Sequence, residues 1–281
     1  MKYTFQASLF ALALATSVQA QVINQISVSK RIQYFQSSAT KVERNAAKTL
    51  PFDFDVEVQG ESRSALAALS PEPSIKLPKK SKFTAITNGL VPTLGLASED
   101  TSFRFGYVGK QNFDNWATKT KKELDDLFPS GDYVIKAEGK TITLNLPEDT
   151  YASAPVLVLS GGRWVNSVYR IKATNALTVN TGIYTNYGQN LNDYISIDMV
   201  DAKTDQEIIS YAQVAKKLAH GPSRSSSRFY SKTIAANKLK AGRTYYVDVS
   251  FGAIVSQSQV LPDALCIGTY VSNTSLTIVV E

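Results

Sequence analysis

Strict alternation of apolar and polar residues constrains the fold of this chain more than any other feature. In residues 52–58 and 245–251 every second side chain is apolar. Successive side chains of a β-strand point to opposite faces, so each segment predicts a strand with one buried, apolar face. Similar segments recur between turn signals along the chain, and we therefore expect a mainly β protein.

The polar side of the first of these strands is acidic. It carries Asp53, Asp55 and Glu57 at strand spacing. Such a row forms either a solvated strand face or a metal or acid–base site, and the sequence favours the solvated face because charged outward faces are common.

The chain is long enough for two domains. It has 281 residues, and 43% of them are hydrophobic, which is enough for two packed cores. Pro147 and Pro155 flank a run of small and polar residues with the composition of a linker. We expect an N-terminal β-rich domain over residues 21–150 and a second domain over residues 153–281.

One segment of the first domain has the period of a helix. Its positions near the i, i+3, i+4 spacing are Phe113, Trp116, Ala117, Thr120, Leu124 and Leu127. Asn112 is suited to cap its start, and Pro129 disfavours helical geometry at the residue before it. These signals predict a single helix in this domain, over about residues 112–128.

Two weaker patterns concern the second domain. Residues 213–219 suggest a short helix, and residues 264–270 and 276–280 read as two strands of a closing hairpin. The polar residues 272–275 would be its turn.

The first twenty residues have the pattern of a secretion signal. A basic start at Lys2 is followed by a short apolar run over residues 9–15, and Ala20 ends a stretch suited to cleavage. The apolar run is shorter than the roughly 20 residues of a membrane span. We expect an exported mature chain, periplasmic or extracellular, with no transmembrane segment. The short signal and the near absence of cysteine indicate a bacterial source.

A turn over residues 240–243 precedes the strand at 245–251, and the tyrosine three residues after the turn's glycine can return its hydroxyl to nearby backbone. The residues of this motif are Leu239, Gly242, Tyr245, Val247 and Val249. Their spacing resembles the corner before strand F of fibronectin type III and related immunoglobulin-like sandwiches. The resemblance covers the chain from Pro155 onward and implies a β-sandwich there. The whole mature chain is also similar in layout to two-domain exported bacterial β-proteins of unassigned function.

The residue types disfavour most enzyme chemistries. His220 is the single histidine, so a histidine-rich metal site is excluded, and Cys266 is the single cysteine, so no internal disulfide can form. Cys266 is expected to be a buried apolar residue. The sequence has no nucleophile elbow, Gly-rich phosphate loop or zinc spacing, and we expect no metal and no cofactor.

The best local candidate for ligand binding is the segment 182–194. It mixes tyrosines with Asn and Gln, a composition suited to stacking on sugars and hydrogen bonding to them. The candidate residues are Tyr184, Asn186, Tyr187 and Tyr194. The alternative, which the sequence favours, is that these tyrosines pack at strand ends.

Two function classes remain. The first is an exported, non-enzymatic binding or structural module that holds a glycan, an envelope surface or another exported protein. The second is a carboxylate-dependent hydrolase acting on polysaccharide, because a carboxylate pair leaves no linear signature. The net charge of +6 favours anionic surfaces only weakly. The lysine cluster at residues 79–82 is too short to suggest nucleic acid as a partner.

Overall fold

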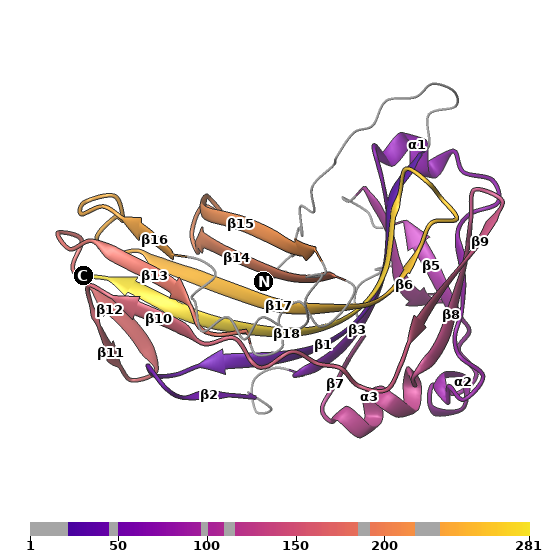
Figure 1. Ribbon diagram of the computed structural model, residues 1–281, viewed down its shortest axis with the longest axis horizontal. Helices are drawn as coiled ribbons and strands as arrows, with labels where there is room; N and C mark the ends of the chain where they lie inside the picture. The colour runs from indigo at the N-terminus through magenta and orange to yellow at the C-terminus, as the bar shows by residue number, and fades with distance from the viewer. Residues whose placement is uncertain (1–21, 45–49, 97–100, 110–115, 185–191, 217–230) are drawn as a thin grey trace.

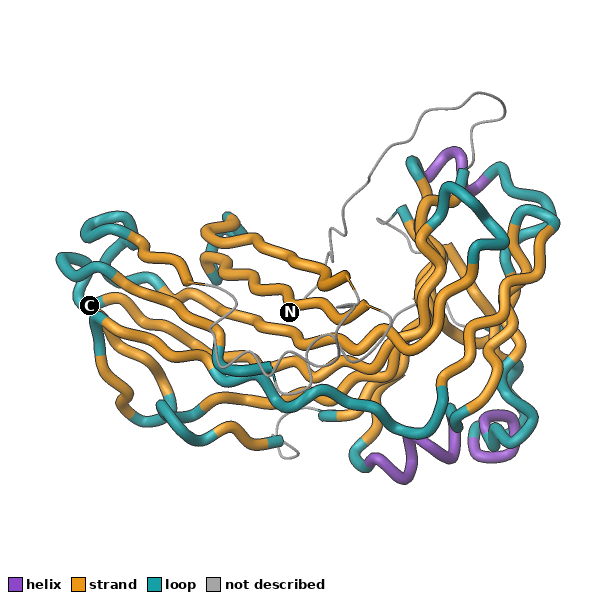
Figure 2. Tube along the Cα trace, in the orientation of Figure 1, coloured by secondary structure: helices purple, strands orange, loops and turns teal. Residues whose placement is uncertain are grey.

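The computed structural model describes residues 22–44, 50–96, 101–109, 116–184, 192–216 and 231–281. Within these ranges strands dominate, as Figure 2 shows, and the expected mainly β fold class is confirmed. The helices are α1 (Arg63–Ala67), α2 (Phe83–Ile86) and α3 (Lys121–Leu127). No helix in the described ranges has the length and apolar character needed to span a membrane.

One large sheet forms the frame of the molecule (Figure 1). Its main path, in spatial order, is β15 (Glu207–Lys216), β14 (Asn192–Asp201), β17 (Thr244–Ser258), β18 (Leu265–Val280), β1 (Ile23–Gln36), β3 (Phe52–Gly60), β6 (Ser102–Tyr107) and β5 (Pro92–Leu96). The shorter strands at its margins are β2 (Val42–Glu43), β7 (Trp116–Thr118), β11 (Arg163–Val165) and β12 (Val168–Ile171). Neighbours along the path are antiparallel, except that β1 and β18 run parallel.

Two smaller sheets pack against one face of the large sheet and enclose two hydrophobic cores. The first consists of β4 (Ser74–Lys76), β8 (Gly131–Ala137) and β9 (Lys140–Leu146), and the second of β10 (Leu157–Ser160), β13 (Leu177–Thr181) and β16 (Ser231–Ile234). The alternation read from the sequence places Val56 and Val58 in the first core and Val247 and Val249 in the second.

The two cores follow the expected division of the chain only in part. Leu261, Cys266 and Tyr270 belong to the first core, although they lie in the range 153–281. Figure 1 shows β17 and β18 running along the molecule and then turning upward at the right. The pairing of these two strands has a register shift between Ile254 and Ser256. The large sheet therefore crosses the division, and independent folding of residues 21–150 and 153–281 stays a prediction. Cys266 is buried, as expected.

The predicted C-terminal hairpin is wrong, because β18 is one continuous strand. Residues 272–275 pair with β17 on one side and with β1 on the other. Three of their four side chains are bonded inside the protein: Asn273 bonds to Ser250 and Gln33, Ser275 donates to Asp248, and the hydroxyl of Ser272 donates to the carbonyl of Ala152 at 2.7 Å. A polar stretch that resembles a turn is here the middle of a central strand.

The predicted helix over residues 112–128 is also wrong in its extent. Trp116 to Thr118 form β7, which pairs with β3, and helix α3 begins only at Lys121. Its cap is Thr120, which accepts from the backbone of Glu123 while the Glu123 side chain accepts from the backbone of Thr120. Asn112 and Phe113 lie outside the described residues.

The expectation of a single helix was wrong as well, since α1 and α2 are short helices that the sequence pattern did not indicate. The suggested helix at residues 213–219 is a strand as far as Lys216, and its remainder lies outside the described residues.

The corner before β17 has the geometry that its sequence suggested. The hydroxyl of Tyr245 accepts from the backbone N–H of Lys240 at 3.1 Å. Gly242 has a φ of +74°, a left-handed conformation that glycine adopts without strain. Leu239 and Tyr245 are both buried in the second core.

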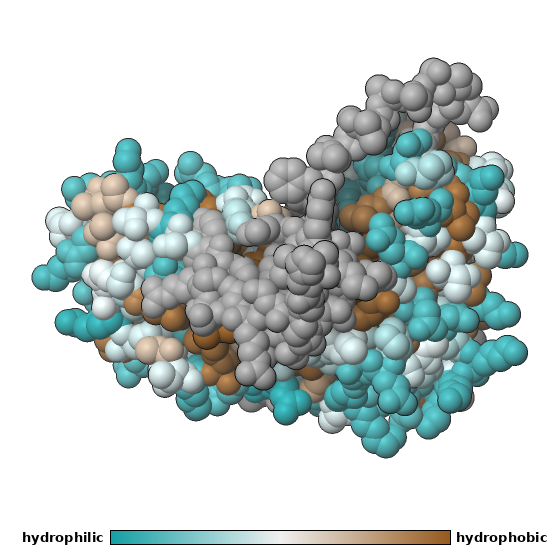
Figure 3. Space-filling model, in the orientation of Figure 1, coloured by the Kyte–Doolittle hydropathy of each residue, from teal (hydrophilic) through white to brown (hydrophobic). Residues whose placement is uncertain are grey.

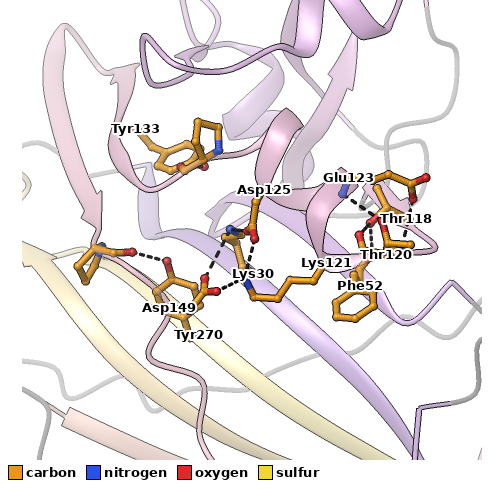
Figure 4. A network of polar contacts seen from close by, with 12 residues as sticks. Lys30, Phe52, Thr118, Thr120, Lys121, Glu123, Asp125, Tyr133, Asp149 and Tyr270 are labelled. Carbon is orange, nitrogen blue, oxygen red and sulfur yellow. Dashed lines mark hydrogen bonds and ion pairs between the residues drawn. The ribbon is translucent and has the colours of Figure 1, made fainter.

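A buried lysine ties β1 to α3 and to the segment after β9 (Figure 4). Lys30 is only 1% exposed, and its ammonium pairs with Asp125 of α3 and lies 3.9 Å from Asp149. Lys121 bonds to the same two carboxylates, so two cations and two anions form a closed neutral group. Tyr270 of β18 lies beside it, with Nζ of Lys30 5.9 Å from its ring centroid. This network holds the Pro147–Pro155 segment against the sheet.

Candidate functional site

The large sheet has a packed face and a polar face. Alternate residues of its central strands point into the two cores, and the residues between them are mostly polar or charged. We call these side chains the polar face: Arg31, Gln33, Asp53, Asp55, Glu57, Arg104, Tyr194, Ser196, Asp198, Ser210, Asp248, Ser250, Asn273 and Ser275. It points away from β8 and β9, which lie outside the bend at the right of Figure 1.

Strand register aligns part of the polar face in rows that cross the strands. The first row is Ser210, Asp198, Asp248 and Ser275. The second row is Ser196, Ser250, Asn273 and Gln33. Directly opposite residues on neighbouring strands have Cβ atoms about 4.5–5.5 Å apart, so neighbours within a row can interact directly.

Buried ion pairs occupy the β1, β3 and β6 side of the polar face. Arg31 binds Asp53 through Nε at 2.6 Å and Asp55 through Nη2 at 3.1 Å. Arg104 binds Glu57 at 3.1 Å and lies 3.5 Å from Asp55. Burial alone would lower the pKa of Arg31, but the charges of the two aspartates outweigh it and raise that pKa.

The expectation that Asp53, Asp55 and Glu57 form a solvated face is therefore wrong. Asp53 is only 2% exposed. The reason is the antiparallel pairing of β1 and β3, which sets Arg31 opposite Asp53 and places a cation against the acidic row.

Amides and hydroxyls continue this network toward β17. Gln33 donates to Asp53 at 2.9 Å and accepts from the Asn273 amide at 2.8 Å. Asn273 in turn accepts from the hydroxyl of Ser250 at 2.8 Å. An unbroken chain of polar contacts therefore runs from Glu57 to Ser250 across strands β6, β3, β1, β18 and β17.

Two carboxyl groups face each other at the β14 and β17 side. Asp198 and Asp248 are directly opposite in register, and Ser275 donates to Asp248. Burial, together with the charges of Asp248 and Glu207, raises the pKa of Asp198 to about 6, and a hydrogen bond from Ser210 opposes this rise. Burial also raises the pKa of Asp248, and hydrogen bonds from Ser275 and Asn273 oppose that rise. Within the described residues no cation contributes to either shift.

Ser196 is a buried hydroxyl without a partner. Its side chain is 5% exposed, and its Oγ has no hydrogen bond within the described part of the chain. It lies between Asp198 and Tyr194 on the same side of β14 and opposite Ser250. A buried hydroxyl with nothing to bond costs about 1–3 kcal/mol, so this one is available to a ligand.

Tyr194 lies over the glycine of the neighbouring strand. Its ring fills the space where a side chain of Gly252 would stand, with Cε1 2.0 Å from the position of such a Cβ. Burial raises the pKa of its hydroxyl to about 12, although the nearby charge of Arg31 opposes that shift. Tyr194 therefore lies on the polar face beside Ser196 and within the electrostatic influence of Arg31.

Of the four predicted ligand-binding residues, the structure describes Tyr184 and Tyr194, and these two lie apart. Tyr184 is 3% exposed and stacks on Phe251 in the second core, with ring centroids 4.7 Å apart. Tyr194 lies on the opposite face of the sheet. The position of Tyr184 agrees with the packing alternative, whereas Asn186 and Tyr187 lie outside the described residues and their role stays a prediction.

Sequence reasoning missed most of the polar face. The signal was present in the polar sides of the strands at residues 194–200 and 245–251, where Ser196, Asp198, Asp248 and Ser250 alternate with apolar residues. The pattern of one strand does not say which strand lies beside it. Only the register shows that these four side chains form a square.

Among the described residues no group of three or more His, Cys, Asp or Glu side chains could hold a metal ion. The basic surface is partly neutralised: Lys82 and Lys122 both pair with Asp126, at 2.8 and 2.6 Å. Figure 3 shows hydrophilic residues over that end of the molecule, where α2 and α3 lie.

No family model matches this chain, and no curated protein matches it. Among solved structures, a match is the crystal structure of chicken CNTN1 FN1-FN3 domains, at 10% identity. It covers 90% of this chain and 68% of that chain, with a TM-score of 0.20. A similarity of this size carries no argument about the function.

Proposed function

We propose that this protein is a non-enzymatic glycan-binding module of a bacterial envelope or extracellular space, and that the polar face is its binding surface. The proposal includes export after cleavage near Ala20. One observation carries it: two adjacent rows of hydrogen-bonding side chains cross the large sheet.

The chemistry of these rows suits a polyhydroxyl ligand. A sugar ring offers donors and acceptors along its edge, and serine, asparagine and aspartate side chains match both kinds. Tyr194 adds an aromatic ring beside them. Arg31 and Arg104 are paired with Asp53, Asp55 and Glu57, so these arginines are not free to bind an anion. Asp198 and Asp248 add further acidic groups, and the polar face therefore disfavours an anionic ligand.

The proposal extends to the architecture of the second half of the chain. We propose that residues 153–281 are a sandwich of the fibronectin type III or immunoglobulin-like kind. The corner at Leu239, Gly242 and Tyr245 supports this reading through the bond from Lys240 to the Tyr245 hydroxyl.

The opposed carboxyl groups favour a second candidate function, a carboxylate-dependent hydrolase acting on polysaccharide. Glycoside hydrolysis needs two carboxyl groups, one of them protonated near neutral pH. Asp198, with its raised pKa, would be the acid, and Asp248 would be its partner.

A glycan array followed by a turnover assay separates the two functions. The mature chain, residues 21–281, is screened on neutral, anionic and amino glycans, and each bound glycan is then incubated with the protein and analysed for cleavage. We expect binding without cleavage. Loss of the signal in Asp248→Asn, but not in Thr233→Ala on the exposed strand β16, would support the polar face. Cleavage that Asp248→Asn abolishes would establish the hydrolase instead, and an array with no signal at all would overturn both functions.

A further inference from the structure

Four side chains of the polar face form a square on strands β14 and β17. Ser196 is opposite Ser250, and two residues along each strand Asp198 is opposite Asp248. The acidic side of the square is partly exposed, whereas the hydroxyl side is buried. A ligand from solvent would therefore reach the square from its acidic side.

The charge around the square is negative and has no partner within the described chain. Glu207 of β15 adds a third carboxylate near Asp198. From β17 and β18 the facing groups are Asp248, Ser275 and Asn273, none of which is a cation. The nearest arginine of the polar face, Arg31, is already held by Asp53 and Asp55.

A second observation points independently to a ligand. The hydroxyl of Ser196 is buried and unpartnered within the described residues, although every other side chain of the square has a partner. A ligand that binds between the two aspartates would lie beside this hydroxyl and could bond to it.

We propose that the square is a subsite for the protonated amine of an amino sugar. The ammonium group binds between Asp198 and Asp248, and a hydroxyl of the same sugar ring bonds to Ser196. Two carboxylates in a partly buried site repel each other, and a cation between them removes that repulsion. This inference rests on the proposed function, since it names the class of glycan that the polar face takes.

The affinity should depend on pH in a defined direction. The ammonium pairs with ionised carboxylates, so binding must release any proton that the two aspartates hold. Affinity should therefore rise as the pH increases from 5 to about 6.5, and it should fall again where the amine of the sugar loses its own proton.

The test compares two tetrasaccharides that differ in one group. Glucosamine tetramer carries free amines, and N-acetylglucosamine tetramer has the same backbone with those amines acylated. Binding of each to the mature chain is measured by calorimetry at pH 6.5 and low salt. We expect glucosamine tetramer to bind at least about tenfold more tightly, with the preference shrinking in 0.5 M salt because exposed charges are screened.

Three variants locate the effect. Asp198→Asn should abolish the preference for the amine, whereas Asp205→Asn, in the exposed turn of the same hairpin, should retain it. Ser196→Ala should weaken binding of both tetramers about two- to tenfold while leaving the melting temperature unchanged or higher, because it removes an unpartnered hydroxyl. A purely structural serine would not change the affinity.

The outcomes separate this inference from the proposed function. Equal affinity for the two tetramers would overturn the amine subsite and leave glycan binding standing. Binding of neither tetramer while another array glycan binds would also overturn it. Retention of the preference in Asp198→Asn would refute the assignment of the site to the square. Absence of any glycan binding would reject the proposed function itself.

Discussion

At the scale of single residues, the polar face shows how this chain buries charge. Arg31 bonds to Asp53 and Asp55 together, and Gln33 supplies Asp53 with a further donor. Each of these three charges has a partner of opposite sign, which is the condition under which buried ions are tolerated.

The Arg31→Ala variant tests this arrangement. The substitution leaves the buried Asp53 without its cation and leaves Asp55 with Arg104 alone, at 3.5 Å, and we expect a loss of about 3–5 kcal/mol in the free energy of unfolding. The matched control is Lys41→Ala, which removes an exposed pair with Glu43 and should cost less than about 1 kcal/mol. Urea unfolding of both variants measures the free energy of unfolding. Equal losses in the two variants would show that the ion pairs of Arg31 do not stabilise the protein.

Asp198 gives a pH dependence of stability. Its pKa of about 6 in the folded state lies above the usual value of about 3.9, so the folded state binds the proton more tightly than the unfolded state does. Its contribution to stability is therefore present at low pH and is lost as the pH rises through about 4 to 6. The variant Asp198→Asn, which cannot ionise, should be about 1 kcal/mol more stable than the parent at pH 8 and equal to it near pH 4. Urea midpoints at pH 4, 6 and 8 check this, and a constant difference at all three would contradict it.

At the scale of elements, the period-two pattern predicted strands well and their partners poorly. The strands at residues 52–58 and 245–251 lie where the alternation placed them. The prediction of a turn at residues 272–275 was wrong because Ser272, Asn273 and Ser275 bond to groups on other strands and segments, a context that local composition does not reveal. The prediction that Trp116 lies in a helix was wrong because its spacing in the sequence fits a helix. In the structure it lies in β7, and its ring packs against Phe83 with ring centroids 5.0 Å apart.

A proline substitution distinguishes a strand from a turn at this position. Thr274 is fully buried and pairs with both β17 and β1, so Thr274→Pro removes a ladder hydrogen bond from a central strand. We expect a loss of at least about 3 kcal/mol. The control is Ala236→Pro, because Ala236 follows Ala235 in a turn closed by the Lys238 N–H, a place where proline is favoured. Thermal melting compares the two, and a Thr274→Pro protein as stable as its control would restore the hairpin reading.

At the scale of the whole molecule, the sequence indicated two bodies and the structure joins them through one sheet. The linker composition near Pro147 and Pro155 suggested a boundary between two domains, and that division stays a prediction. It could not show that the last strand returns beside the first, because pairing between β1 and β18 joins residues about 240 positions apart. The C-terminal strand thereby completes the N-terminal core through Cys266 and Tyr270.

This arrangement predicts cooperative unfolding, and the two tryptophans report on it. Trp116 packs against the first core and Trp164 against the second. In the single-tryptophan variants Trp164→Phe and Trp116→Phe, fluorescence follows one core at a time.

Since β1, β17 and β18 form one ladder across both cores, and Lys30 fixes the linker segment to that ladder, neither core can lose its sheet without the other. We expect both variants to unfold in urea with a fluorescence midpoint that coincides with the midpoint of circular dichroism in the same protein. Two resolved midpoints would instead show that the halves are separable domains, as the linker composition suggested.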